Sequence, residues 1–308
     1  MLAKFGAVKI KNLPSISGKA VILPPTAAAA LEVQYGVVRI DEDLVVDAFG
    51  RPAPAQPAQT VPWGIMRVGA DQVWTQTEGD MVKVAVVDTG IDLTHPDLQV
   101  NIKGGYNAID STRSANDDNG HGTHVAGTIA AAQNGIGVVG MGPKINLYAV
   151  KVLNRQGSGY LSDIIEGLDW VAANGIQVVN MSLGSKTGNQ SFHDAVIRTK
   201  QAGVVLVAAA GNDYGGAVSF PAAYPEVIAV SATDSGDQMA VFSSVGPEVD
   251  IAAPGVSVFS TYKGSSYKTL SGTSMATPHV AGAVALVLTM PVGLYDLDAD
   301  GAWDPSEV

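Results

Sequence analysis

The pattern of hydrophobic residues changes along the chain at about residue 60. After this point, short apolar runs rich in β-branched residues alternate with segments of helical periodicity. Runs that are apolar at nearly every position are typical of strands buried on both faces of a parallel sheet. The pattern predicts such strands at 82–88, 145–153, 176–184, 203–212 and 226–233.

Segments with helical periodicity lie between these strands, at 122–133, 161–175 and 191–203. A further, almost wholly apolar helix is expected to begin around Ser274. The alternation predicts an α/β fold, a doubly wound and mainly parallel sheet with helices on both faces. Ligands in this architecture bind beyond the carboxyl ends of the strands, so residues that directly follow strands are the first candidates for chemistry.

The first 50 residues have a different pattern, which predicts a small α+β segment. We expect strands at 8–13 and 19–24, a helix at 26–36, and a strand pair or one bent strand at 37–49. A segment of this size buries little surface and is expected to lean on the part of the chain that follows. We therefore divide the chain into this segment (1–50), a proline-rich linker (51–58), a main domain (59–290) and an acidic end (291–308).

Composition and charge exclude several classes of function. Of the 308 residues, 46% are hydrophobic and 15% are charged, which is typical of a compact globular protein. The net charge of -11 argues against nucleic acid and anionic membranes as partners. Because there is no cysteine, disulfides, a thiol nucleophile and thiolate metal ligands are excluded. No apolar run has membrane-spanning length, and the first 25 residues lack the apolar core of a signal peptide.

Polar side chains occupy the ends of two predicted strands and the beginnings of two predicted helices. Asp88 ends the strand at 82–88 and Asn212 ends the strand at 203–212, whereas His121 and Ser274 open helices. Taken singly, Asp88 could cap a helix or turn and Asn212 could belong to a Gly-Asn turn. A metal pair of His121 with the histidine three residues later lacks zinc-motif spacing, so we expect that second histidine to be a packed core residue.

Together these four residues favour nucleophilic catalysis. A serine hydroxyl is a weak nucleophile that needs a base within hydrogen-bond reach, and His121 can supply it. A helix N-terminus at Ser274 offers free N–H groups for developing negative charge, and the Asn212 amide is a suitable second donor. The order Asp88, His121, Ser274 along the chain is one of the known orders of a catalytic triad.

Three long blocks, "VVDTGID", "GHGTHVAG" and "GTSMATPHVAG", resemble the motifs of the subtilisin-like serine peptidases, or subtilases. The resemblance covers roughly residues 59–290. It implies that Ser274 is the nucleophile, that His121 is the general base and then acid, and that Asp88 orients the imidazole. It also implies that Asn212 and the Ser274 N–H form the oxyanion hole.

The resemblance further implies a serine endopeptidase whose polypeptide substrates bind as an added strand between two backbone segments. These segments would be Gly157, Ser158 and Gly159 on one side and Ser182, Leu183 and Gly184 on the other. Main-chain hydrogen bonds would hold any extended peptide, which is the β-augmentation mode of recognition.

The stretch "AAQNGIGVVG" resembles the high-affinity calcium loop of the family, although an ordinary glycine-rich loop is the alternative. The resemblance implies Ca²⁺ as the cofactor, and all of the implied ligands are oxygen donors. They are Gln59, Asp97, Ala132, Asn134, Ile136 and Val138.

The acidic end of the chain carries a second candidate calcium site. Its residues fit positions 1, 3, 5, 9 and 12 of an EF-hand loop, with glycine at position 6. These residues are Asp296, Asp298, Asp300, Asp304 and Glu307. No exiting helix follows in this sequence, so weak binding is expected, and a solvated acidic tail is the alternative.

Residues 1–50 resemble the end of a subtilase propeptide, shortened at its start. The resemblance implies a precursor that its own propeptide inhibits in cis, with a processing site between Phe49 and Gln59. We expect a monomer that is secreted, with a signal peptide absent from this chain. Two alternatives stay open: a catalytically silent, self-inhibited fragment that only binds calcium, and a folding switch that calcium controls.

Overall fold

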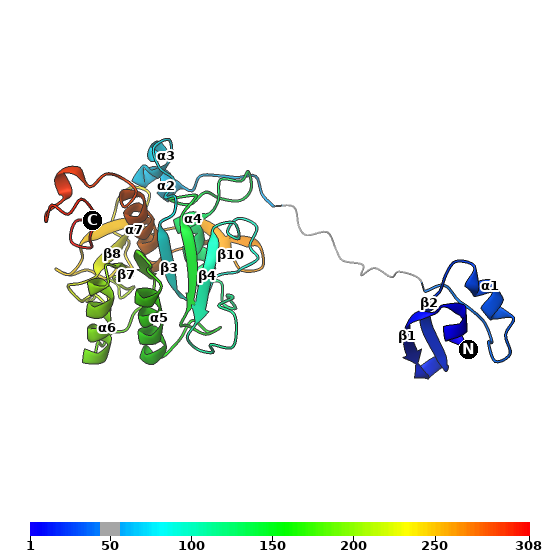
Figure 1. Ribbon diagram of the computed structural model, residues 1–308. Helices are drawn as coiled ribbons and strands as arrows, with labels where there is room; N and C mark the ends of the chain where they lie inside the picture. Colours follow the sequence, from blue (N-terminus) through cyan, green and yellow to red (C-terminus); the bar gives the residue numbers. More distant parts are fainter. Residues whose placement is uncertain (44–55) are drawn as a thin grey trace. The chain divides into compact units, whose positions relative to one another are not determined.

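The computed structural model describes residues 1–43 and 56–308 (Figure 1). The chain divides into two compact units, Met1–Pro54 and Ala55–Val308. The second unit begins before Gln59, because the Gly137 N–H already donates to the Pro57 carbonyl over 2.8 Å. The last residues of the expected linker therefore hydrogen-bond to the main domain, while residues 51–55 of that linker lie outside the described residues.

The first unit contains the expected hairpin and helix. Strand β1 (Val8–Leu13) pairs antiparallel with β2 (Gly18–Ile22), and α1 (Ala27–Glu32) follows. Short 3-10 helices, η1 (Leu2–Phe5) and η2 (Pro14–Ile16), complete the unit. Among its side chains of described burial, Leu31 alone is buried, so the core of this unit is thin.

The strand expected at 37–49 is wrong as far as residue 43, because 37–43 form no strand. Val38 is 97% exposed, so β-branched residues in this stretch find no sheet to pack against. A strand needs a neighbouring strand for its hydrogen bonds, and local propensity alone does not supply one. Residues 44–49 of that expected strand lie outside the described residues.

The second unit is built on a sheet of seven parallel strands in the order β4-β5-β3-β6-β7-β8-β9. The five expected strands are confirmed and form its centre. They are β3 (Lys83–Asp88), β5 (Asn146–Lys151), β6 (Val178–Met181), β7 (Val205–Ala209) and β8 (Ile228–Thr233).

The two edge strands, β4 (Ile102–Asn107) and β9 (Ile251–Pro254), were not expected from the sequence. An edge strand has a neighbour on only one side, so it tolerates residues that a central strand excludes. Strand β4 contains two glycines and β9 ends in a proline, and both features weaken a strand signal in the sequence.

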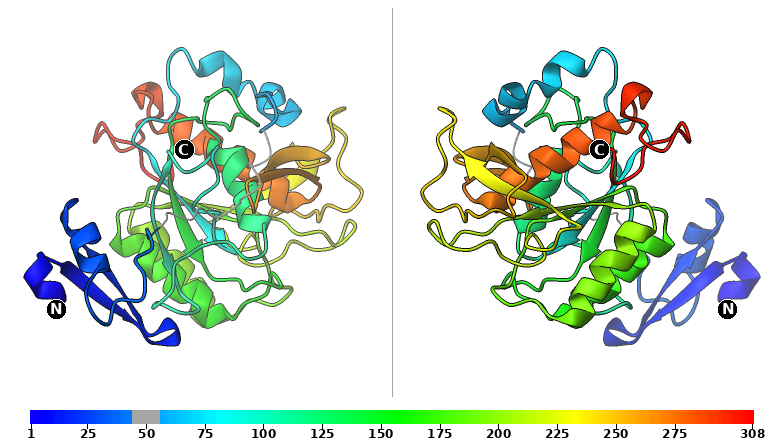
Figure 2. Two further views of the ribbon diagram at one scale, coloured as in Figure 1. Left: turned by 90° about the vertical axis from the view of Figure 1, so that its right-hand side faces the viewer. Right: turned by 90° about the vertical axis from the view of Figure 1, so that its left-hand side faces the viewer.

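Helices cover both faces of the sheet, as expected (Figures 1 and 2). Side chains of β3 alternate between two cores, with Val84 and Val86 in one and Ala85 and Val87 in the other. The first core includes residues of α4 (His121–Ala130) and α7 (Thr273–Val287). The second includes residues of α5 (Leu161–Ala173) and α6 (Gln190–Gln201).

A hairpin of β10 (Val258–Tyr262) and β11 (Ser266–Leu270) lies outside the main sheet and leads directly into α7. It packs against α4 through hydrogen bonds from Ser260 and Thr261 to carbonyls of that helix. The remaining elements are the short helices α2 (Trp63–Val68), α3 (Ala70–Val73) and η3 (Gly293–Tyr295).

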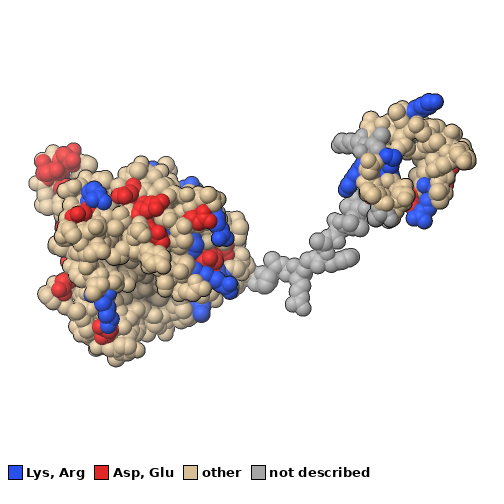
Figure 3. All heavy atoms as spheres, turned by 90° about the horizontal axis from the view of Figure 1, so that it is seen from below, with Lys and Arg blue, Asp and Glu red and all other residues tan. Residues whose placement is uncertain are grey.

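Two further observations concern the charges on the surface and the length and polarity of the helices. On the face of the second unit in Figure 3, acidic and basic side chains are interspersed rather than segregated by sign. Within the described ranges, every helix is too short or too polar to cross a bilayer.

Candidate active site

The strand order gathers the candidate residues at one edge of the sheet. Asp88 ends β3, and β3 lies between β5 and β6. The segment 157–159 follows β5, the segment 182–184 follows β6, and Asn212 follows β7. Because the strands are parallel, their carboxyl ends meet at the same edge, which is where ligands bind in this architecture.

His121 and Asp88 are in direct contact. The Nδ1 atom of His121 lies 2.8 Å from Oδ1 and 2.9 Å from Oδ2 of Asp88, which is fully buried. A Cβ on Gly122 would fall 2.1 Å from the carbonyl oxygen of Gly90, so only glycine lets α4 begin this close to β3. An ionised carboxylate only accepts hydrogen bonds, so Nδ1 carries the ring proton and Nε2 is left as an acceptor.

The environment of His121 raises the pKa of its imidazole. Burial, the largest effect, lowers the pKa, but the charge of Asp88, its hydrogen bond and the charge of Asp117 together outweigh burial. His124 behaves in the opposite way, since burial lowers its pKa to about 4. Its Nε2 donates to the Lys268 carbonyl over 3.0 Å, which confirms the expected packed core histidine.

Asp117 is a residue of this site that the sequence reasoning missed. Its carboxylate accepts from the Thr89 hydroxyl over 2.9 Å and from the Gly120 N–H over 2.9 Å. It also accepts from the N–H and the hydroxyl of Thr123, over 3.0 and 2.6 Å. These bonds fix the start of α4, and with it the position of His121. The available signal was an acidic pair just before a helix, where carboxylates are favoured.

Ser274 is the second residue of α7 and is half-buried. Its hydroxyl donates to the Ser182 carbonyl over 3.2 Å, and the Ser182 hydroxyl donates to the Ser274 carbonyl over 2.8 Å. Among the described residues, no hydrogen bond joins Ser274 to His121. The Ser274 hydroxyl has to give up its hydrogen bond to the Ser182 carbonyl before it can donate to an imidazole.

The backbone N–H of Ser274 and the side chain of Asn212 are the expected anion-binding pair. Ser274 lies in the first turn of α7, where N–H groups have no partner within the helix. The Asn212 carbonyl oxygen accepts from the N–H and the hydroxyl of Thr273, over 3.0 and 3.1 Å. This pair of bonds assigns the amide orientation and leaves the Asn212 NH₂ group available to donate.

The two expected peptide-binding segments offer unpaired backbone at the same edge. Gly157, Ser158 and Gly159 are exposed, and the first two belong to a turn in which the Asn154 N–H donates to the Ser158 carbonyl over 2.8 Å. Ser182 is buried, Leu183 is half-buried and Gly184 is exposed. In the described part of the chain, no hydrogen bond uses the backbone N–H or C=O of Gly159 or Gly184.

The expected calcium loop brings carbonyl oxygens together around one point. The side-chain nitrogen of Gln59 lies 2.7 Å from the Ala132 oxygen and 3.2 Å from the oxygens of both Ile136 and Val138. Asn134 is exposed, and its side-chain oxygen accepts from the Ile136 N–H over 3.1 Å. The Gln59 amide nitrogen occupies the point where the three carbonyl oxygens converge. A calcium ion could bind at the same point, because calcium prefers oxygen ligands such as backbone carbonyls.

Asp97 supplies the charge at this loop and has an unusual environment. It is fully buried, and one carboxylate oxygen accepts from the Val138 N–H over 2.9 Å. The other oxygen, Oδ1, is buried and has no hydrogen-bond partner among the described residues. Burial raises the pKa of Asp97 to about 6. A buried carboxylate oxygen without a partner is costly, and its presence beside converging carbonyls fits a calcium ion.

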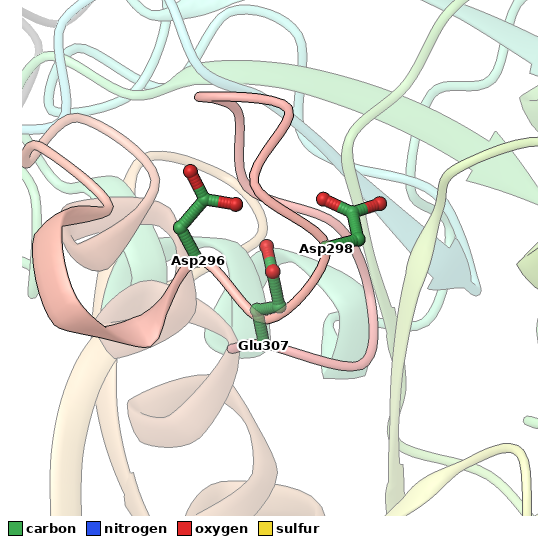
Figure 4. Close-up of side chains that lie close together, drawn as sticks. All are labelled: Asp296, Asp298 and Glu307. Atoms are coloured by element: carbon green, nitrogen blue, oxygen red, sulfur yellow. The ribbon is translucent and has the colours of Figure 1, made fainter.

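The acidic C-terminal loop brings together three of its five expected ligands. Asp296, Asp298 and Glu307 point toward one another, and one oxygen of each lies within 4.8 Å of the others (Figure 4). Asp300 and Asp304 lie outside this group, and their carboxylates accept from nearby backbone N–H groups instead.

Comparisons with known proteins agree with this geometry. The model of the subtilase family matches residues 79–292. The chain is 49% identical to an alkaline protease of Alkalihalobacillus alcalophilus over 280 residues, which are 91% of this chain and 70% of that protein. It is 54% identical to subtilisin Savinase of Lederbergia lenta over 231 residues, 75% of this chain and 85% of that protein. It is 44% identical to subtilisin NAT of Bacillus subtilis subsp. natto over 295 residues, 94% of this chain and 75% of that protein.

The fold, the family match and these relatives define the chain as a serine endopeptidase. The chain belongs to the subtilase family, because the family model covers more than half of it.

Proposed function

We propose that this chain hydrolyses peptide bonds within extended polypeptides through Asp88, His121 and Ser274. The observation that carries the proposal is the contact of His121 Nδ1 with both oxygens of the buried Asp88. Few other arrangements explain a buried carboxylate beside a half-exposed imidazole at the carboxyl edge of a parallel sheet.

In the proposed reaction, the Ser274 oxygen attacks the carbonyl carbon while the hydroxyl proton moves to His121 Nε2. The C–O bond forms as the carbonyl π bond breaks, and the charge on the oxyanion is met by the Asn212 amide and the Ser274 N–H. The imidazolium then gives its proton to the leaving amine, which leaves an acyl-enzyme that water hydrolyses by the reverse sequence. Asp88 stays ionised and stabilises the imidazolium.

The substrate is proposed to bind as a strand between 157–159 and 182–184. Support comes from the unpaired backbone groups of Gly159 and Gly184, which an extended peptide can pair with. Main-chain recognition is independent of side chains, so we propose broad activity on unfolded segments.

Covalent labelling tests the proposed site directly. The chain, in calcium and after it has been cut between Phe49 and Gln59, is exposed to a fluorophosphonate, whose phosphorus an activated serine attacks with loss of fluoride. We expect one adduct by intact mass, mapped to Ser274, and no adduct on the denatured chain. A folded chain without an adduct would contradict an assembled site and support the alternative, a silent self-inhibited fragment.

We further propose that calcium stabilises the protein at the loop after α4. The proposed ligands are the side chains of Gln59, Asp97 and Asn134 and the carbonyls of Ala132, Ile136 and Val138. The ion would supply positive charge to the buried Asp97 carboxylate, whose Oδ1 has no other partner. Asp296, Asp298 and Glu307 are proposed as a second and weaker site, to which Asp300 and Asp304 would have to move.

Replacing Asp97 with asparagine should abolish the thermal stabilisation that calcium gives. At calcium 100-fold above Kd, bound ion stabilises the folded state by about 2.7 kcal/mol. This corresponds to a shift of about 5–10 °C in Tm for a domain of this size. Melting is measured with calcium and with chelator, in the Ser274→Ala background so that autolysis does not interfere.

Asp298→Asn is the matched variant for the C-terminal loop and should keep most of that shift. If the calcium shift survives in Asp97→Asn but disappears in Asp298→Asn, the main ion lies at the C-terminal loop instead. A parent protein whose Tm is the same in calcium and chelator would contradict calcium stabilisation altogether.

We propose that residues 1–50 are a propeptide that inhibits the site until the chain is cut between Phe49 and Gln59. Support comes from the alignment with the alkaline protease, whose 280 residues are more than the second unit contains, so it extends into the first. A precursor that is inactive until it is cut suits an enzyme that is exported, and we therefore propose action outside the cell.

A further inference from the structure

Within residues 1–43 and 56–308, two buried polar atoms near the proposed calcium loop have no hydrogen-bond partner. They are Oδ1 of Asp97 and the hydroxyl of Tyr267, which lies on β11. The two groups contact adjacent residues of one loop, because the Asp97 carboxylate accepts from the Val138 N–H over 2.9 Å and a Cβ on Gly137 would fall 2.1 Å from the Tyr267 hydroxyl. Buried polar groups in native proteins are normally paired, so two neighbouring exceptions need a physical explanation.

The ring of Tyr267 packs between the proposed calcium loop and the ring of His95. A Cβ on Gly137 would fall 2.1 Å from the Tyr267 hydroxyl, and Gly137 lies between the two carbonyl residues Ile136 and Val138. On its other side, the ring of His95 meets Tyr267 edge-on, with centroids 5.3 Å apart and planes at 86°. Tyr267 therefore has little freedom to turn its hydroxyl away from the loop.

Strand β11 also connects this loop to the candidate catalytic residues. His124, three residues after His121 on α4, donates from Nε2 to the carbonyls of Val258 and Lys268, over 3.1 and 3.0 Å. The strand ends at Leu270, only four residues before Ser274. Tyr267 lies on β11 and contacts the proposed metal loop. Through β11, the loop is therefore connected to α4, which carries His121, and to α7, which carries Ser274.

We propose that Tyr267 is a positioning residue of the calcium site, whose hydroxyl donates to Asp97 Oδ1 and holds that carboxylate toward the ion. A carboxylate oxygen has two lone pairs, so Oδ1 can accept this hydrogen bond and still bind calcium. The inference rests on the calcium site proposed above and deepens it. Outer partners of this kind orient metal ligands, and losing one typically lowers metal affinity about 10–100-fold.

The test is the Tyr267→Phe variant of the full chain, which keeps the ring and removes only the hydroxyl. Calcium affinity is measured by titration calorimetry in the Ser274→Ala background, and Tm is measured in chelator. We expect the Kd for calcium to rise at least tenfold, whereas Tm in chelator stays at the parent value. A role in holding the carboxylate toward the ion shows in the calcium affinity, whereas a packing role would lower Tm with or without the metal.

Tyr106→Phe is the matched control. The hydroxyl of Tyr106 also bonds a carboxylate, Glu166, but on β4 and α5 rather than at the loop. This variant should bind calcium as the parent does.

The variants separate failure of this inference from failure of the calcium site. If Asp97→Asn loses calcium binding but Tyr267→Phe keeps the parent Kd, Tyr267 has no positioning role and the calcium site stands. If Tyr267→Phe lowers Tm equally in calcium and in chelator with an unchanged Kd, its role is packing alone. If Asp97→Asn binds calcium like the parent, the proposed calcium site itself is wrong.

Discussion

The Ser274→Ala variant is expected to lose peptide hydrolysis while keeping its fold. The loss in kcat should be about 10⁶-fold, the size known for the nucleophile of subtilisin, a member of this family. Removal of one oxygen at a half-buried position leaves the packing of α7 intact, so Tm should change little. Hydrolysis of an unstructured peptide is measured together with the intact mass of the chain.

The same variant tests the proposed precursor. Without its nucleophile the chain should persist at its full 31.6 kDa, and a trace of active parent should cut it between Phe49 and Gln59. Ser271→Ala is the matched control in the same stretch, because the Ser271 hydroxyl accepts from the Ser257 N–H and is away from the candidate catalytic contacts described above. Turnover by Ser274→Ala at a rate comparable to the parent would remove Ser274 from the mechanism.

The Asp88→Asn variant is expected to lose about 10⁴ in kcat/KM, the size known for this change in another serine protease. Asparagine can donate to His121 Nδ1, which moves the ring proton to Nε2, the atom that has to accept the serine proton. The heavy-atom geometry stays nearly the same, so the loss in kcat/KM is expected to come from the wrong tautomer of His121 and not from misfolding. Rates are compared well above the His121 pKa.

The pH dependence of the parent gives an independent check on this pair. Only the neutral imidazole accepts a proton, and Asp88 helps to raise the pKa of His121, so activity should fall as pH drops through a value above 6.5. Without the charge of Asp88, any residual activity should fall at a lower pH. Asp118→Asn removes a carboxylate that pairs with Lys151 and should keep the parent profile within experimental error. If activity of Asp88→Asn falls at the same pH as activity of the parent, Asp88 does not act on His121 as proposed.

The sequence predicted the centre of the sheet but not its edges. Strands such as β3 and β7 are buried on both faces, so nearly every residue in them is apolar and the signal is strong. The edge strands β4 and β9 pair with a strand on one side only, so glycine and proline are tolerated there. In the first unit, residues 37–43 of the strand expected at 37–49 form no strand, because no partner strand lies beside them among the described residues.

The candidate residues Asp88, His121, Ser274 and Asn212 could be selected from the sequence, because each stands where a strand is predicted to end or a helix to begin. The contact of His121 with Asp88 and the hydrogen bond of Ser274 to Ser182 could not be read in this way. These distances depend on how segments far apart in the chain pack together.

The sequence by itself determined the class of this protein, because its three long motifs and its alternating apolar runs are local patterns. Only the tertiary structure decided that Asp117 fixes the start of α4 and that the Tyr267 hydroxyl lies against Gly137. A single aspartate or tyrosine gives no local signal of its partners. Burial and hydrogen bonding arise only when distant segments meet, so these roles are properties of the packed fold.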